Sequence, residues 1–180
     1  FSSADRTATI TGNVLLKDPG MELTTDALRY DLRNERAEYD TGARIVSSRD
    51  GNTLTSQHGA YLAALHRFIF SGNVRIEHPD RTITADTLHY VTTSGVAEFM
   101  GPTEITQGST HMYCERGSYD TRAGLGRFTK AARISSGGQT LTGDSLHYDR
   151  ATGEGLGWGH VQVVDSASDL IVRGERGKHL

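Results

Sequence analysis

The chain has 180 residues, of which 36% are hydrophobic and 7% aromatic, and it carries a formal net charge of −3 at neutral pH. A chain of this length folds as one domain with a substantial core, since it buries about 70% of the surface exposed when unfolded. The charge lacks the basic excess of nucleic-acid binders, so we expect no nucleic-acid partner and disfavour anionic membrane surfaces. No apolar run reaches the roughly 20 residues of a membrane-spanning helix. The single cysteine excludes an internal disulfide.

An eight-residue segment that usually ends on tyrosine recurs along the chain. It reads LTTDALRY at 23–30, LTSQHGAY at 54–61, ITADTLHY at 83–90, MYCERGSY at 112–119 and LTGDSLHY at 141–148, with a frayed copy, VRGERGKH, at 172–179. The shared tyrosines Tyr30, Tyr61, Tyr90, Tyr119 and Tyr148 stand 31, 29, 29 and 29 residues apart. This period predicts six repeats of about 29–31 residues within a single domain spanning residues 1–180.

A second β-branched segment lies between the tyrosine segments. It begins at Ile10 (ITGNVLL), Tyr39 (YDTGARI), Phe70 (FSGNVRI), Phe99 (FMGPTEI), Phe128 (FTKAARI) and Trp158 (WGHVQV). The alternation of Val, Ile, Thr and Tyr with polar residues favours strands. Short turn sequences separate the segments, at 18–20, 49–51, 78–80, 107–109 and 136–138, and connections this short join antiparallel neighbours. We therefore predict an all-β meander of about twelve antiparallel strands, with a parallel β-solenoid as the alternative.

The buried parity changes in the middle of the tyrosine segments. Ile83 and Ala85 are expected to face inward, and so are Leu88 and Tyr90. Residues on one face of a regular strand are an even number of positions apart, but Ala85 and Leu88 are an odd number apart. Gly72 and Gly101 stand midway along the neighbouring segments, where the missing side chain lets a strand bend. We expect each hairpin to be creased, and the creased hairpins to form a semi-closed jellyroll around an apolar trough.

Stacked repeats turn equivalent positions into columns along this trough. One column is Ile10, Tyr39, Phe70, Phe99, Phe128 and Trp158; another is Leu16, Ile45, Ile76, Ile105, Ile134 and Val163; a third is Leu23, Leu54, Ile83, Met112, Leu141 and Val172. A fourth alternates large and absent side chains: Leu28, Gly59, Leu88, Gly117, Leu146 and Gly177. Its glycines either interleave with large neighbours in a packed core or leave gaps for acyl chains. Cys114 aligns with small residues and is expected to be an inert core residue.

The chain shows no pattern of a metal site or a catalytic site. The acidic column of Asp26, Asp86, Glu115 and Asp144 places successive carboxylates about 9.6 Å apart or more, too far for one cation to bridge. His89 and His147 are about 19 Å apart by the same spacing. No HExxH, GxSxG, Walker or CxxC motif is present. We expect no cofactor and no metal, and an enzyme acting on polysaccharides is only a remote alternative.

The motif GNV-x-Ile/Leu (12–16 and 72–76), followed by Ile/Leu-T-Ala/Gly-D-x-L-x-Y, resembles the repeat of the OstA-like family, which includes LptA, LptC and the periplasmic domain of LptD. The similarity spans roughly residues 8 to 177, although the second and fifth repeats (TGARI and KAARI) lack the signature. The resemblance implies a non-enzymatic β-jellyroll bridge in the Gram-negative periplasm that binds lipopolysaccharide and shields the acyl chains of lipid A. The signal peptide is then presumed to be removed or to lie outside this sequence.

The candidate lipid-binding residues are taken from the columns. They are Leu23, Leu28, Leu54, Phe70, Ile76, Ile83, Leu88, Phe99, Ile105, Met112, Phe128, Ile134, Leu141 and Leu146. The first strand, around residues 8–16, and the last, around 170–172, carry no blocking proline or charge, so strand addition to other OstA-like Lpt components or to a second copy, head to tail, is expected. A structural or assembly module that carries no lipid is the alternative function.

Overall fold

The computed structural model describes residues 6–18, 20–48 and 51–179. They form sixteen β-strands and one 3-10 turn, η1 (Ala63–Leu65), with no α-helix in these ranges. By contact density the chain divides into two compact units, Phe1–Thr93 and Ser94–Leu180. None of the described segments is a helix long and apolar enough to cross a membrane. The sequence prediction that residues 1–180 form a single domain stays a prediction.

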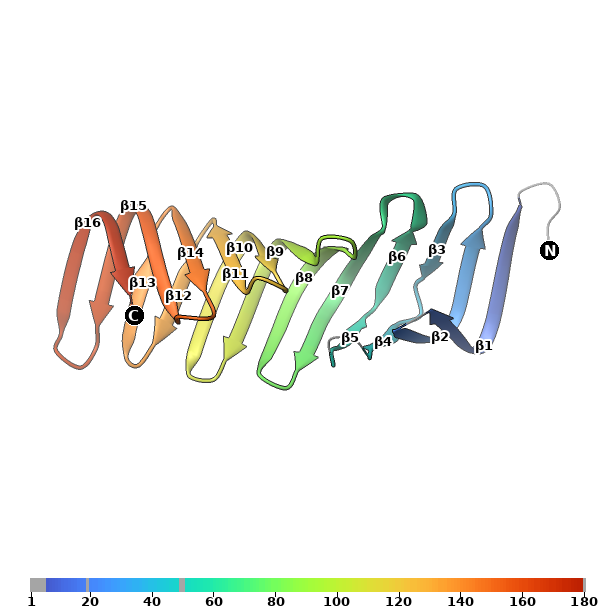
Figure 1. Cartoon of the computed structure of the whole chain (residues 1–180), viewed down its shortest axis with the longest axis horizontal. Coiled ribbons are helices and arrows are strands. Elements are labelled where there is room, and N and C mark those ends of the chain that lie inside the picture. Colours follow the sequence, from blue (N-terminus) through green and yellow to red (C-terminus); the bar gives the residue numbers. More distant parts are fainter. Residues whose placement is uncertain (1–5, 19, 49–50, 180) are drawn as a thin grey trace. The chain divides into compact units, whose positions relative to one another are not determined.

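The first unit contains eight strands. They are β1 (Thr7–Asp18), β2 (Met21–Asp31), β3 (Arg36–Tyr39), β4 (Ala43–Ser47), β5 (Thr53–Ser56), β6 (His58–Leu62), β7 (Arg67–His78) and β8 (Arg81–Val91). The second unit also contains eight: β9 (Val96–Gln107), β10 (Thr110–Asp120), β11 (Leu125–Thr129), β12 (Arg133–Ser136), β13 (Gln139–Thr142), β14 (Ser145–Asp149), β15 (Glu154–Asp165) and β16 (Leu170–His179). Figure 1 shows the strands of each unit side by side.

The strand count differs from the expected twelve because four long segments are interrupted. β3 continues into β4, β5 into β6, β11 into β12 and β13 into β14 after breaks of one to three residues. Four interruptions among sixteen strands leave twelve extended segments, as expected. Every pairing within each unit is antiparallel, so the parallel solenoid is excluded. The turns at 78–80, 107–109 and 136–138 separate strands as predicted, whereas Pro19 and the pair Arg49 and Asp50 lie outside the described residues.

Every second long segment is creased near its middle by residues in the left-handed backbone region. In β7 these are Gly72 (φ 74°) and Asn73 (φ 51°), which together oppose one residue of β8, Asp86. Two residues against one is a β-bulge, which bends β7 and shifts the parity of the inward residues on its partner β8. Ile83, Ala85 and Leu88 are all buried as a result. The predicted break of parity is therefore confirmed.

The same conformation recurs at the other creases. Positive φ angles occur at Gly12 and Asn13, at Gly42, at Gly101, at Lys130 and Ala131, and at Gly159 and His160. The Gly-Asn of the GNV signature is thus the pair of residues that most readily adopts this conformation. The segment KAARI makes the same bend without glycine, at Lys130 (φ 55°) and Ala131 (φ 54°).

The creases divide the strands of each unit into two sets of half-strands, which we call the tyrosine arm and the isoleucine arm. The tyrosine arm of the first unit comprises 7–11, 27–31, 36–39, 58–62, 67–71 and 87–91, and its isoleucine arm comprises 14–18, 21–25, 43–47, 53–56, 74–78 and 81–85. The tyrosine arm of the second unit comprises 96–100, 116–120, 125–129, 145–149, 154–158 and 176–179, and its isoleucine arm comprises 103–107, 110–114, 133–136, 139–142, 161–165 and 170–174.

Replacing Ala131 by glycine is expected to raise the free energy of unfolding by about 1 kcal/mol, because an L-residue in the left-handed region is strained and glycine is not. Ala131 is exposed, so its methyl group contributes little packing. The neighbouring Ala132 is 2% exposed and has no positive φ. Its glycine variant serves as the control and should lose about 1 kcal/mol in urea unfolding. Equal losses in both variants would show that the crease is not strained.

Candidate functional site

The inner face of each isoleucine arm carries a continuous row of aliphatic side chains. Consecutive members face each other across paired strands. The row is Leu16, Leu23, Ile45, Leu54, Ile76 and Ile83 in the first unit, and Ile105, Met112, Ile134, Leu141, Val163 and Val172 in the second. The second and third sequence columns therefore merge into one row in each unit.

A second row crosses the tyrosine arms next to the crease and combines large side chains with glycines. In the second unit it runs Phe99, Gly117, Phe128, Leu146, Gly157 and Gly177. In the first unit Ile10 faces Leu28, and Tyr39, Gly59, Phe70 and Leu88 follow one another. The glycine positions are filled by neighbours: a Cβ at Gly59 would overlap the Tyr39 ring, and one at Gly177 would lie 2.6 Å from Val161 Cγ1. Interleaving in a packed core, and not a set of gaps, explains this column.

Trp158 does not belong to the inner row in which the sequence columns placed it. Gly157 faces Leu146 and occupies the inner position, whereas Trp158 is paired with the outward Ser145. The cause is the distance to the crease, since one residue separates Phe70 from Gly72 but none separates Trp158 from Gly159. An offset of one residue moves a side chain to the other face of a strand. Trp158 is therefore an outer-face residue.

The fourteen candidate residues all lie on these two inner rows. Thirteen of them are buried, and only Ile76 is partly exposed. Phe128, Ile134, Leu141 and Leu146 have 0% of their surface accessible. A side chain with no accessible surface has no water-sized space beside it. The interior of the second unit is thus closely packed in this structure, and contact with lipid remains a prediction.

A third inner row, closer to the hairpin turns, contains the repeated tyrosines. It reads Ala8, Tyr30, Ala37, Tyr61, Phe68 and Tyr90 in the first unit, and Ala97, Tyr119, Gly126, Tyr148, Gly155 and His179 in the second. The rings of Tyr61 and Phe68 stack with centroids 4.4 Å apart. Tyrosine combines an apolar ring with a polar tip, which suits the border between an apolar interior and water.

The two arms of the second unit meet across the interior. His179 faces Gly155 and Gln139 faces Asp165, near opposite ends of β15. Ten residues of flat strand span about 33 Å, yet His179 Nδ1 lies 3.1 Å from Gln139 Oε1, to which it donates a hydrogen bond. A strand whose two ends are joined in this way is folded over at its crease. The opening between the turn ends of the two arms is called the mouth below.

A second contact spans the same mouth. Burial raises the pKa of the Tyr148 hydroxyl, which makes a side-chain hydrogen bond with Thr110 that opposes the rise. Tyr148 belongs to the tyrosine arm and Thr110 begins the isoleucine arm of β10. A Cβ at Gly155 would also lie 3.2 Å from Ile134 Cδ1 of the opposite arm. Polar residues therefore close the mouth, and apolar residues from both arms meet behind it. The sequence columns did not include His179, Gln139, Thr110 or Tyr148.

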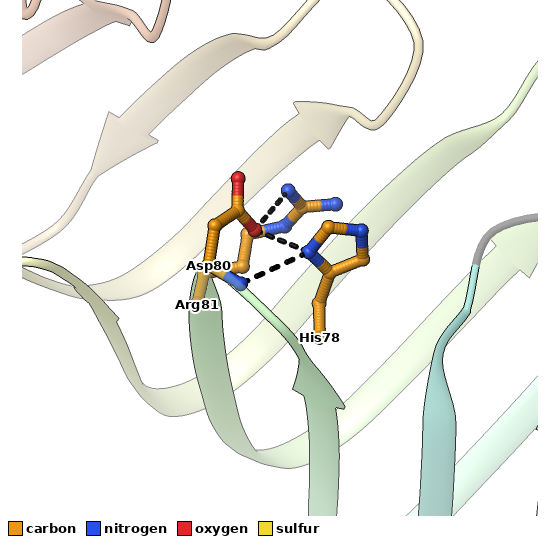
Figure 2. Close-up of polar contacts among 3 residues, drawn as sticks. All are labelled: His78, Asp80 and Arg81. Carbon is orange, nitrogen blue, oxygen red and sulfur yellow. Dashed lines mark hydrogen bonds and ion pairs between the residues drawn. The ribbon is translucent and has the colours of Figure 1, made fainter.

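At the corresponding turn of the first unit a charged cluster lies between β7 and β8. Arg81 Nη1 donates a hydrogen bond of 2.9 Å to Asp80 Oδ1, and the His78 ring contacts the same carboxylate, as Figure 2 shows. Arg81 has the same parity as Ile83 and is only 8% exposed. The inner row of the isoleucine arm thus also ends on a polar, charge-balanced residue towards the turn.

The remaining polar candidates face outward or are buried without reactivity. Asp26, Asp86 and Asp144 are exposed, and Asp144 Oδ2 accepts a hydrogen bond of 2.8 Å from His160. Burial raises the pKa of the Cys114 thiol to about 12, so it is an inert core residue, as expected. Within the three described ranges no group of three His, Cys, Asp or Glu side chains is placed to hold a metal ion.

Two shallow hollows lie beside creases, on outward-facing residues. The larger, of about 620 Å³, is in the second unit and is lined by residues that include Lys130, Arg133 and His160. The smaller, of about 360 Å³, is in the first unit and includes Asn13, Asp26 and Arg44. Lys130 and His160 each have an acidic partner, Glu115 and Asp144. Neither hollow opens on the apolar rows.

These features define a class: an antiparallel β protein whose creased strands enclose apolar rows bordered by polar residues. The family model described as LptA/(LptD N-terminal domain) LPS transport protein matches residues 53–154, more than half of the chain. A model described as OstA-like protein matches residues 1–86. The chain belongs to the LptA/LptD N-terminal family of lipopolysaccharide-transport proteins, which are not enzymes. The resemblance seen in the repeat sequence is confirmed.

One of the solved structures similar to this chain supports the fold. It is LptH of Pseudomonas aeruginosa, described as the LptA homologous periplasmic component of the conserved lipopolysaccharide transport device. The TM-score is 0.53 with 12% sequence identity, and the match covers 73% of this chain and 96% of LptH. At this identity the match shows a common fold. No curated protein sequence matches the chain.

Replacing Gly117 by alanine is expected to lower the free energy of unfolding by about 1–3 kcal/mol, because the new Cβ would lie 2.7 Å from the Arg127 carbonyl oxygen and 3.0 Å from Phe128 Cδ1. Gly174 is the matched control, since its Cβ would meet nothing closer than 3.7 Å. We expect Gly174→Ala to be neutral or stabilising by less than about 1 kcal/mol in urea unfolding. A Gly117→Ala variant as stable as the control would show unfilled space in the interior.

Proposed function

We propose that this chain is a periplasmic lipopolysaccharide-binding transport or bridge protein that shields the acyl chains of lipid A between the inner and outer membranes. The proposal rests on the order of residues across the interior. Two aliphatic and aromatic rows lie nearest the crease, tyrosines follow, and hydrogen-bonding groups stand at the mouth. That order matches an amphiphile with buried acyl chains and a polar head. Membership of the family and the periplasmic LptH support the location.

The acyl chains are proposed to lie against the fourteen inner residues of the two apolar rows. Those residues are hydrophobic in both units and belong to strands that pair throughout each unit. Each methylene group transferred from water into such an interior contributes about 0.8 kcal/mol.

Because the interior of the second unit has no free space, lipid entry requires the arms to part. The contacts across the mouth are few and polar: His179 with Gln139 and Tyr148 with Thr110. A hydrogen bond of this kind contributes roughly 1 kcal/mol net. The mouth is therefore the weakest line along which the two arms can separate, whereas the crease is continuous backbone.

The edge strands are proposed to join other OstA-like Lpt components or a second copy, head to tail. Among the described pairings β1 pairs only with β2, and β16 only with β15. Ile10 and Leu15 on β1, and Leu170, Ile171 and Val172 on β16, are 51–53% exposed. Unpaired edges with exposed apolar residues accept an added strand. These same edges would also serve a scaffold that carries no lipid, so the test concerns the interior.

Photo-crosslinking residues at Leu88, Ile105 and Phe128 are expected to form adducts with lipopolysaccharide on illumination, since all three are at most 2% exposed on the inner rows. Thr84 and Glu104 are the matched controls, because each is next to an inner residue on the same strand but faces outward. Gel electrophoresis detects the adducts formed at the three inner positions and at the two control positions. Circular dichroism checks that each variant is folded. Lipid A binding by the unmodified chain gives the affinity with which the variants are compared. Adducts at the controls alone, or none in folded variants, would favour the scaffold.

A further inference from the structure

The outer face of the tyrosine arm in the second unit gathers basic residues around the only tryptophan of the chain. Two adjacent rows cross the paired strands on this face. One row is Arg127, His147, Leu156 and Lys178, and the other is Arg116, Thr129, Ser145, Trp158 and Arg176. We call these nine residues the basic face. None of them belongs to the apolar rows or to the hollows beside the creases.

The basic face carries four cationic side chains on a chain whose net charge is −3. Arg116, Arg127 and Arg176 are exposed and form no ion pair with any described carboxylate. Lys178 pairs with Glu154 at 2.7 Å. Other carboxylates border the two rows. Glu98 is on the strand next to Arg116, and Asp120 and Asp149 are in the next outer row, where they accept amides of their own turns. Glu115 and Glu175 adjoin Arg116 and Arg176 at the crease. The two rows themselves contain basic and no acidic side chains.

Trp158 stands among these charges, next to the ring of His147 and close to Leu156. Its ring centroid is 4.6 Å from that of His147, at an interplanar angle of 56°. Burial, and secondarily the charge of Arg127, hold the pKa of His147 below its ordinary value, so this ring is neutral at pH 7. Leu156 pairs with His147 on the next strand. The result is a partly exposed apolar centre with arginines on both sides of it.

The spacing of the cations decides which kind of partner fits. Arg127 and Lys178 are three strands apart, about 14 Å, and Arg116 and Arg176 are four strands apart, about 19 Å. Side chains so spread over a pleated sheet face do not converge on one phosphate group. They match a laterally continuous anionic surface, and an indole flanked by cations is the arrangement that settles at the headgroup level of a bilayer.

We propose that the basic face docks the second unit on the surface of an anionic lipid bilayer, with Trp158 entering the headgroup layer. The inference does not depend on lipid carriage in the interior, because the two sites occupy opposite faces of the tyrosine arm. It also revises the expectation drawn from net charge alone, since a local excess of arginine suffices for such binding.

Because Trp158 is the only tryptophan, its fluorescence reports this face without a label. Vesicles of phosphatidylcholine with about 30% phosphatidylglycerol are expected to shift its emission to the blue, because anionic headgroups attract the basic face. Vesicles of pure phosphatidylcholine are expected to leave the emission unchanged. The triple variant Arg116→Gln, Arg127→Gln, Arg176→Gln should lower the vesicle partition coefficient about a hundredfold.

The control variant is Arg29→Gln, Arg33→Gln, Arg44→Gln, which removes three exposed arginines of the first unit. Its net charge equals that of the first triple variant. It should bind anionic vesicles within about twofold of the unaltered chain. The proposal is overturned by the absence of a shift with anionic vesicles, by an equal shift with neutral vesicles, or by equal losses in the two triple variants. Binding to an acidic protein without binding to vesicles would overturn it as well.

Discussion

The structure depends on the left-handed residues at the crease of every second long strand. A flat strand of this pattern would present alternate side chains to two opposite faces, and its arms would share no interior. Two residues opposite one, as Gly72 and Asn73 stand opposite Asp86, both bend the strand and reset the parity of its partner strand. The Ile83 position and the Leu88 position then face the same space although they are an odd number of positions apart in the strand. Without the bulge there would be no enclosed apolar row.

The enclosed rows explain why a protein of this family needs no catalytic group. Transport of an amphiphile requires an apolar space with a polar border, and the order from Phe128 and Ile134 through Tyr148 to the His179–Gln139 contact provides it. The interior of the second unit is filled in this structure by its own side chains, with Leu141, Leu146 and Val161 occupying the space at Gly157. The closed form keeps the apolar rows away from water.

The sequence predicted the antiparallel β fold, the creases and the inner position of all fourteen candidate residues, because repeats average out the ambiguity of any one strand. It failed where a repeat departs from its pattern. Trp158 was placed inside because aromatic residues precede the crease in the other copies, but the crease itself lies one residue closer. The four interruptions that make sixteen strands depend on hydrogen bonding at the creases, which local sequence does not report.

Contacts between distant segments were also beyond the sequence. His179 and Gln139 are 40 residues apart, and nothing in either segment indicates that β15 folds back to join them. The basic face draws Arg116 and Arg176 from strands 60 positions apart, and net charge conceals it. Strand register supplied both findings, since a residue's lateral neighbours are set by pairing and not by its place in the chain.

The central claim is that lipopolysaccharide enters by parting the two arms, and the distance across the mouth of the second unit tests it most directly. Spin labels at Ala151→Cys and Ala167→Cys, in a Cys114→Ala background, flank the two ends of β15 on exposed turns. Pulsed electron paramagnetic resonance is expected to give one short distance in the free protein and a longer one with lipopolysaccharide bound. An unchanged distance in a protein that demonstrably binds lipopolysaccharide would contradict the account.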